Sequence, residues 1–199
     1  MWVAEPIENQ LFVLVLQHPQ EKKETLATAA TACAALRRSA LVVGLSWPNL
    51  SRVLGRSADP KHWAVLYLGS ARPSAFRSEQ EIFALDRRGE PVADRDATLR
   101  HLEGVILLDG SWGEVKTLWW RNPWLLKLNR IVLNPQRRSR FGRLRREPRR
   151  EALSTIEAAA LLLRHLDGGP DIETRLLAEF DQLLAEARPG RRNQERVSV

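Results

Sequence analysis

The clearest feature of the hydrophobic pattern is a series of short apolar runs that contain no charged residue. The four strongest runs occupy residues 11–16, 40–45, 63–68 and 104–108. Such runs lack the polar alternation of a half-exposed strand, so they predict strands buried on both faces, which is typical of a parallel sheet covered by helices. Shorter strands are predicted at residues 81–85 and 130–134, with a turn at 87–91.

Helical patterns fill most of the intervals between these runs. They cover residues 24–38, 111–120, 154–167 and 171–188, with one further short helical stretch between residues 46 and 62. Ser111 and either Ser154 or Thr155 stand where an N-cap is expected, because a side-chain oxygen there can accept a first-turn N–H group. Strands alternating with helices predict an α/β fold with a largely parallel sheet and helices on both faces.

Length and composition indicate one globular domain. A chain of 199 residues with 44% hydrophobic side chains can bury one sizeable core. We expect this domain to span residues 1–188 and residues 189–199 to form a disordered basic tail. No segment reaches the roughly 18 apolar residues of a membrane span, and the N-terminus lacks the pattern of a secretory signal. We therefore expect a cytoplasmic protein without a membrane partner.

The positive charge is concentrated in one segment. The net charge is +7, and residues 137–150 hold eight arginines with Glu147 as their single acid. Guanidinium groups match phosphate oxygens through paired hydrogen bonds, and Phe141 can stack on a base. A solvated surface loop is the alternative interpretation of a charge run, but the near absence of acids favours RNA or another polyanion.

Cysteine and glycine patterns exclude several kinds of site. Cys33 is the single cysteine, which excludes an internal disulfide framework and a cysteine-based zinc site. No spacing matches a metal site, a P-loop or a Gly-x-Gly-x-x-Gly nucleotide site. We therefore expect no metal.

Polar residues follow the apolar runs, at the strand ends where parallel sheets bind ligands. Asp109-Gly110-Ser111-Trp112 follows the run at residues 104–108. An aspartate in that position can also simply cap the next turn through the backbone. Asp109 taken alone therefore fits either a structural or a chemical role.

Several of these segments resemble the signature of the DTW-domain family, the tRNA-uridine aminocarboxypropyltransferases. They are Asp109-Gly110-Ser111-Trp112, Arg145-Arg146-Glu147-Pro148, the segment 153–158, and the earlier segments 17–21 and 66–70. The resemblance covers roughly residues 11–166, with five motifs in the family's order. The chain departs from the family at Ser111, where the motif has threonine, and it lacks the N-terminal cysteine cluster of many members.

The resemblance implies S-adenosylmethionine as co-substrate and a knotted fold related to the SPOUT methyltransferases. It also implies transfer of the 3-amino-3-carboxypropyl group to N3 of a tRNA uridine, with release of 5′-methylthioadenosine. The donor must present its aminocarboxypropyl carbon rather than its methyl group, because the sulfonium activates both. The N3 proton must also leave, and a carboxylate can take it or orient the ring.

The matching motifs imply roles for individual residues. Asp109 is the expected catalytic residue, as a base or as an orienting group. The expected binding residues for S-adenosylmethionine are Leu68, Gly69, Ser70, Gly110, Ser111, Trp112, Leu153, Ser154, Thr155 and Glu157. The expected RNA-binding residues are His18, Arg137, Arg138, Arg140, Arg143, Arg145 and Arg146.

Two other functions remain open from the sequence. A SPOUT-type RNA methyltransferase would share the fold and co-substrate but would release S-adenosylhomocysteine. A non-catalytic RNA-binding module would show no specific affinity for S-adenosylmethionine. The choice between tRNA and rRNA as acceptor and the oligomeric state also remain open.

Overall fold

The computed structural model describes residues 5–20, 26–67, 79–86, 88–137, 139–140, 153–167 and 169–187. Within these residues, six strands form one sheet in the order β2-β1-β5-β3-β6-β4. The strands are β1 (Phe12–Gln17), β2 (Ser39–Val43), β3 (Trp63–Leu66), β4 (Ile82–Leu85), β5 (Gly104–Asp109) and β6 (Asn129–Leu133).

The sheet is mostly parallel, as the sequence predicted. β1 pairs in parallel with β2 and β5, and β3 pairs in parallel with β5 and β6. β4, the least distinct of the predicted strands, pairs antiparallel with β6 and forms an edge of the sheet. β5 therefore lies near the middle of the sheet, with its carboxyl end beside that of β1.

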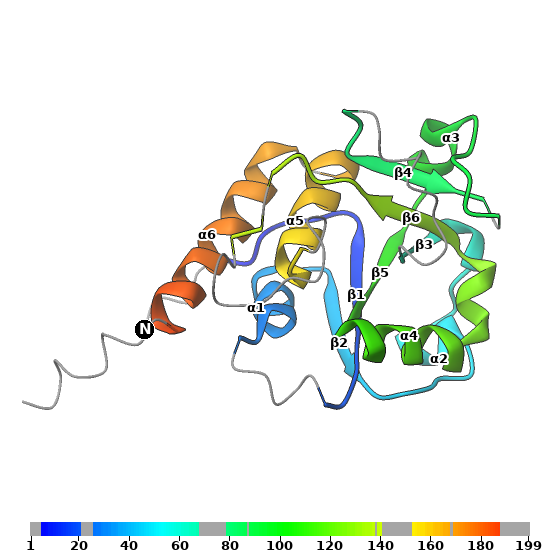
Figure 1. The fold of residues 1–199 in the computed structure, drawn as a ribbon, viewed down its shortest axis with the longest axis horizontal. Coiled ribbons are helices and arrows are strands. Elements are labelled where there is room, and N and C mark those ends of the chain that lie inside the picture. The colour runs from blue at the N-terminus through cyan, green and yellow to red at the C-terminus, as the bar shows by residue number, and fades with distance from the viewer. Residues whose placement is uncertain are drawn as a thin grey trace, which may run out of the picture.

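Helices cover both faces of this sheet (Figure 1). One face packs against α1 (Thr28–Ala35), α5 (Thr155–Leu166) and α6 (Pro170–Ala187). The other face packs against α2 (Leu50–Leu54), α4 (Trp112–Arg121) and the 3-10 turn η4 (Pro123–Lys127). A second 3-10 turn, η2 (Pro60–His62), precedes β3, and α3 (Arg95–Arg100) lies beside β4. The expectation of helices on both faces is confirmed.

The strand β1 shows why its sequence is a continuous apolar run. Val13 and Val15 point to the α1, α5 and α6 side, while Leu14 and Leu16 point to the α2 and η4 side. All four side chains are fully buried. Successive strand residues face opposite sides of a sheet, so burial on both sides removes the polar alternation. Truncating Leu14 to alanine would cost about 2–5 kcal/mol of folding free energy.

Two helices differ from the sequence prediction. α1 ends at Ala35 rather than at residue 38, because Leu36 turns to an extended conformation and forms a parallel bridge with Ile7. α3 was not predicted at all. Its N-cap is Asp94, whose side chain accepts a hydrogen bond from the backbone N–H of Ala97 at 2.9 Å.

Two expectations concern residues that are not described. The chain between β6 and α5 includes residues 141–152, which lie outside the described residues, so the knot stays a prediction. Residues 188–199 also lie outside them, and the proposed boundary between domain and tail stays a prediction as well. In the described parts of the chain, no helix combines the length and apolar character needed to cross a membrane.

Candidate active site at the carboxyl edge of the sheet

The carboxylate of Asp109 is the centre of a hydrogen-bonded group at the carboxyl edge of the sheet. Gln17 is its register partner at the end of β1, and Gln17 Nε2 donates to Asp109 Oδ2 at 2.8 Å. The hydroxyl of Thr155, at the start of α5, donates to Asp109 Oδ1. Asp109 is buried, with 7% of its surface exposed. β1 and α5 therefore hold this carboxylate, at the end of β5, in one orientation.

The carboxylate of Asp109 can still accept further hydrogen bonds. An ionised carboxyl group has about four lone-pair sites, and two protein donors occupy two of them. The described donors therefore leave acceptor capacity at the Asp109 carboxylate.

The turn after β5 depends on glycine. Gly110 has φ +154°, and a Cβ atom built on it would lie 2.9 Å from Glu114 Cβ and 3.4 Å from His18 Cβ. The first turn of α4 therefore lies closer to the end of β1 than a residue with a side chain at position 110 would allow. Ser111 is the N-cap of α4, as predicted, and its backbone N–H donates to Glu114 Oε2 at 2.6 Å.

His18 lies against the same turn. Its backbone N–H donates to the carbonyl oxygen of Asp109 at 3.0 Å. Its imidazole Nδ1 lies 3.5 Å from Glu114 Oε1, and the residue is 9% exposed. His18 thus connects the end of β1 to the first turn of α4.

Glu157 organises the start of α5. Ser154, the N-cap, donates to Glu157 Oε2 through its backbone N–H at 3.0 Å and its hydroxyl at 2.7 Å. The hydroxyl of Ser139 donates to the same oxygen at 2.7 Å, and the backbone N–H of Arg140 donates to Oε1 at 2.6 Å. The buried Glu157 side chain therefore joins α5 to the beginning of the arginine-rich segment.

The structure brings most of the described candidate residues to this edge. Asp109, Gly110, Ser111 and Thr155 form one group with His18 beside it. Trp112, the first residue of α4, is 43% exposed. Leu153 packs against the apolar core beneath α5.

The remaining candidates divide into two groups. Arg137 is exposed, whereas the guanidinium of Arg140 pairs with Asp181 of α6. Outside the described residues lie Leu68, Gly69, Ser70, Arg138, Arg143, Arg145 and Arg146.

The structure adds side chains that were not singled out from the sequence. Gln17 lies within one of the resembling motifs, but its bond to Asp109 follows only from the strand register. Tyr67, just after β3, stacks on Trp119 of α4, with ring centroids 4.1 Å apart and planes 18° apart. The guanidinium carbon of Arg130 lies 5.6 Å from the centroid of the Tyr67 ring, and Arg130 Nε donates to the Tyr67 carbonyl oxygen at 2.9 Å.

Burial changes the ionisation of this aromatic group. It raises the pKa of Tyr67 above its usual 10.0, and the positive charge of Arg130 partly opposes that change. Burial also lowers the pKa of Arg130. Tyr67 follows β3, the strand that pairs with β5, so the stack lies at the end of the strand next to the one that ends at Asp109.

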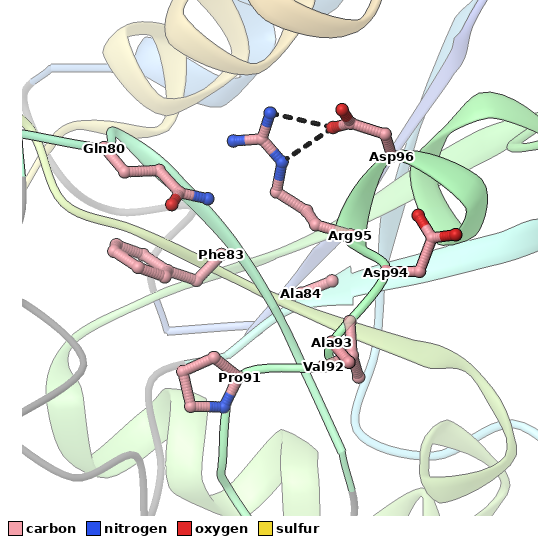
Figure 2. Close-up of a pocket in the computed structure, with 9 residues that line it drawn as sticks. All are labelled: Gln80, Phe83, Ala84, Pro91, Val92, Ala93, Asp94, Arg95 and Asp96. Carbon is pink, nitrogen blue, oxygen red and sulfur yellow. Dashed lines mark hydrogen bonds and ion pairs between the residues drawn. The ribbon is translucent and has the colours of Figure 1, made fainter.

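Two hollows lined by described residues lie elsewhere. The larger, of about 420 Å³, lies between β4 and the segment that leads into α3 (Figure 2). Its one arginine, Arg95, donates to Asp96 from Nε at 3.0 Å and from a terminal nitrogen at 2.8 Å. The smaller, of about 190 Å³, lies between α3 and the end of α5. β4 is three strands from β5, so neither hollow belongs to the Asp109 group.

The fold and this edge define the class of the protein: an α/β protein with a mostly parallel sheet and a polar site at the carboxyl ends of its central strands. The model of the DTW domain matches residues 2–188, so the chain belongs to the DTW-domain family. The described residues contain no cluster of three or more His, Cys, Asp or Glu side chains that could hold a metal ion.

Three curated relatives carry the name tRNA-uridine aminocarboxypropyltransferase 2. The chain is 25% identical to the Macaca fascicularis protein over 187 residues, covering 90% of this chain and 56% of the relative. It is 28% identical to the Drosophila melanogaster protein over 179 residues, covering 86% of this chain and 62% of the relative. It is 25% identical to the Mus musculus protein over 181 residues, covering 89% of this chain and 55% of the relative. The chain thus spans 55–62% of the length of these relatives. No solved structure matches it significantly.

Proposed function

We propose that this protein transfers the 3-amino-3-carboxypropyl group of S-adenosylmethionine to N3 of a uridine in tRNA and releases 5′-methylthioadenosine. The family match and the relatives named tRNA-uridine aminocarboxypropyltransferase 2 support the reaction class. The observation that carries the proposal is the hydrogen bond between Asp109 and Thr155, which come from two separate family motifs.

The hydrogen-bonding groups at this edge of the sheet fit the amino-acid end of S-adenosylmethionine. Its ammonium group requires acceptors, which backbone carbonyl oxygens of the strand-end turns can supply. Its carboxylate requires donors, which hydroxyl groups and first-turn N–H groups of helices supply. We assign this role to the segments that contain Gly110, Ser111 and Thr155, with Ser154 and Glu157 shaping the start of α5. The adenosine part is assigned to Trp112, Leu153 and the segment 68–70.

The reaction balances without any metal or redox step. S-adenosylmethionine supplies a carbon made electrophilic by the adjacent sulfonium. The uridine N3 forms a bond to that carbon, the carbon–sulfur bond breaks, and its electron pair stays on sulfur as the neutral thioether of methylthioadenosine. Asp109 accepts the N3 proton or, through a hydrogen bond, orients the ring. Gln17 and Thr155 keep this carboxylate in place, so no reorientation is needed during transfer.

The arginine-rich segment is assigned to the RNA backbone. Because Glu157 binds Ser139 and Arg140, this segment begins beside the start of α5 and close to Thr155. We assign phosphate binding in this segment to Arg137, Arg138, Arg143, Arg145 and Arg146. Arg140 can also bind phosphate, although its guanidinium pairs with Asp181. His18, at the end of β1, is assigned to the RNA as well. Neutralising Arg137, Arg138 and Arg140 together should weaken tRNA binding and reduce its salt dependence. Unchanged affinity at every salt concentration would remove the segment from the interface.

The released product tests the reaction directly. The protein is incubated with S-adenosylmethionine and tRNA, and both the nucleosides and the small-molecule product are identified by mass spectrometry. Aminocarboxypropyl uridine with methylthioadenosine is the expected pair. A methylated nucleoside with S-adenosylhomocysteine would identify an RNA methyltransferase instead. RNA binding without turnover of S-adenosylmethionine would indicate a binding module, and rRNA in a parallel reaction tests the acceptor.

Substitution of Asp109 tests the site. Asp109→Asn and Asp109→Ala should abolish transfer while the affinity for S-adenosylmethionine, measured by isothermal titration, largely survives. Asp94→Asn is the matched control, because it removes a carboxylate that caps α3 beside β4, where asparagine can cap as well. An unchanged transfer rate in Asp109→Ala would exclude Asp109 from the mechanism.

A further inference from the structure

Exposed apolar side chains are concentrated in one stretch of the described chain. Of the four large hydrophobic side chains that are exposed there, three lie between residues 112 and 126: Trp112, Trp120 and Leu126. Trp120 is 76% exposed and Leu126 is 59% exposed. Isolated exposed apolar residues are common, but several large ones close together indicate a surface that binds a partner.

Helical geometry places two of these side chains on one face of α4. Trp112, Lys116 and Trp120 are spaced four residues apart, so they follow one another along the same side of the helix. The helix rises about 1.5 Å per residue, which separates Trp112 from Trp120 by about 12 Å along the axis. Leu118 is buried on the opposite side, and α4 lies on the outside of the molecule (Figure 1).

The charge on this surface is positive. Lys116, Arg121 and Lys127 are exposed on α4 and η4. Glu114 is the single acid between residues 112 and 127, and its carboxylate faces the backbone of Ser111 and the imidazole of His18. The exposed surface of α4 and η4 therefore combines an indole ring with cationic groups, and the one acid of this segment is turned toward Ser111 and His18.

We propose that the exposed surface of α4 and η4, which carries Lys116, Trp120, Arg121, Leu126 and Lys127, is a docking surface for unpaired nucleotides of the RNA substrate. Indole rings stack on bases of any sequence, and ammonium and guanidinium groups bind the phosphates between them. α4 begins at Trp112, three residues after Asp109, so this surface adjoins the candidate active site. This inference rests on the proposed function for the identity of the RNA as tRNA.

Charge complementarity favours RNA over a second copy of this chain. A twofold contact would bring two copies of the same positively charged patch together, which Coulomb repulsion opposes. A polyanion neutralises these groups instead and releases its own counterions.

The test measures RNA binding by the full chain. A labelled short oligouridylate and tRNA serve as probes, and fluorescence anisotropy gives their affinities over a range of salt concentrations. Trp120→Ala should weaken oligouridylate binding about tenfold, while Trp120→Phe, which keeps an aromatic face, should lose much less. Lys116→Ala should reduce the slope of log affinity against log salt by about 0.7. Lys61→Ala makes the same charge change at the amino end of β3 and should leave both quantities unchanged.

The outcomes separate this surface from the activity. Wild-type transfer to tRNA together with unchanged RNA binding by Trp120→Ala and Lys116→Ala would overturn the docking surface and leave the proposed reaction intact. Absence of transfer, together with RNA binding that Trp120→Ala weakens, would overturn the proposed reaction and support the docking surface. Light scattering completes the test: a dimer that Trp120→Ala converts to monomer, with RNA affinity unchanged, would show a self-interface and overturn the proposal.

Discussion

The hydroxyl of Thr155 donates a hydrogen bond to the carboxylate of Asp109 across forty-six residues of sequence. Thr155 is the first residue of α5, and Asp109 is the last residue of β5. This single contact fixes the start of a helix above the end of a central strand. It also leaves the carboxylate fully oriented, because Gln17 donates to its other oxygen.

Removing the Thr155 hydroxyl should impair transfer more than folding. Thr155→Val keeps the shape of the side chain but leaves Asp109 Oδ1 without its donor. We expect kcat to fall about a hundredfold, as displaced catalytic groups do, with a loss of about 1 kcal/mol of stability. Steady-state kinetics and thermal unfolding measure the two effects. Thr155→Ser restores the donor and should retain most of the activity; wild-type kcat in the valine variant would contradict the assignment.

Replacing Gln17 should weaken the fold itself. Gln17→Leu leaves a buried carboxylate oxygen without its protein donor, which we expect to cost about 1–3 kcal/mol of unfolding free energy in urea titrations. Gln182→Leu is the matched control, because Gln182 is exposed on α6 and contacts only Glu186 among the described hydrogen bonds. Equal stability of the two variants would show that the Gln17 contact contributes nothing.

The elements that could be predicted from sequence are those whose signal is local. β1 and β5 are buried on both faces, so their residues form unbroken apolar runs, and Asp109 stands visibly at the end of one of them. α3 could not be predicted, because it buries no residue and so shows no apolar periodicity. The bond between Gln17 and Asp109 depends on strand register, a relationship between distant segments that no local pattern contains.

A side chain at Gly110 should displace the turn after β5. In Gly110→Ala the new Cβ atom would come within 2.9 Å of Glu114 Cβ, at a φ of +154° that alanine rarely adopts. The first turn of α4 must then move away from His18, and transfer should fall together with stability. Gly113→Ala is the control in the same helix, since a Cβ atom there meets nothing within 4 Å. Melting temperatures and transfer rates are measured for both variants. Equal values for Gly110→Ala and Gly113→Ala would contradict this prediction.

Glu157 should contribute substantially to stability. Its carboxylate accepts four hydrogen bonds from Ser154, Ser139 and Arg140, so Glu157→Gln turns an NH₂ group toward donors that need an acceptor. Because bonds to a charged group contribute about 1.5–3 kcal/mol each, we expect a loss of at least about 2 kcal/mol in denaturant unfolding. Glu186→Gln, on the exposed part of α6, should change stability little. A small effect in both variants would mean that the segment at Ser139 is held by other contacts.

The thiol of Cys33 should be unreactive in the folded protein. Burial raises its pKa from 9.0 to about 11, the hydrogen bond with Ser39 lowers it, and the charge of Asp109 raises it further. Because the thiolate is the reactive form, a thiol reagent at pH 8 should label the native chain far more slowly than the unfolded chain.

The same shift should make stability depend on pH. The unfolded thiol ionises near 9.0 and the folded thiol near 11, so the contribution of Cys33 is complete below pH 9 and is lost as the pH rises towards 11. Cys33→Ala should flatten the stability profile in that window, which urea unfolding at several pH values measures. Since Cys33 is the chain's one cysteine, labelling reports on it alone. A native labelling rate equal to the unfolded rate, or an unchanged profile in Cys33→Ala, would show that partial burial does not raise the pKa of this thiol in solution.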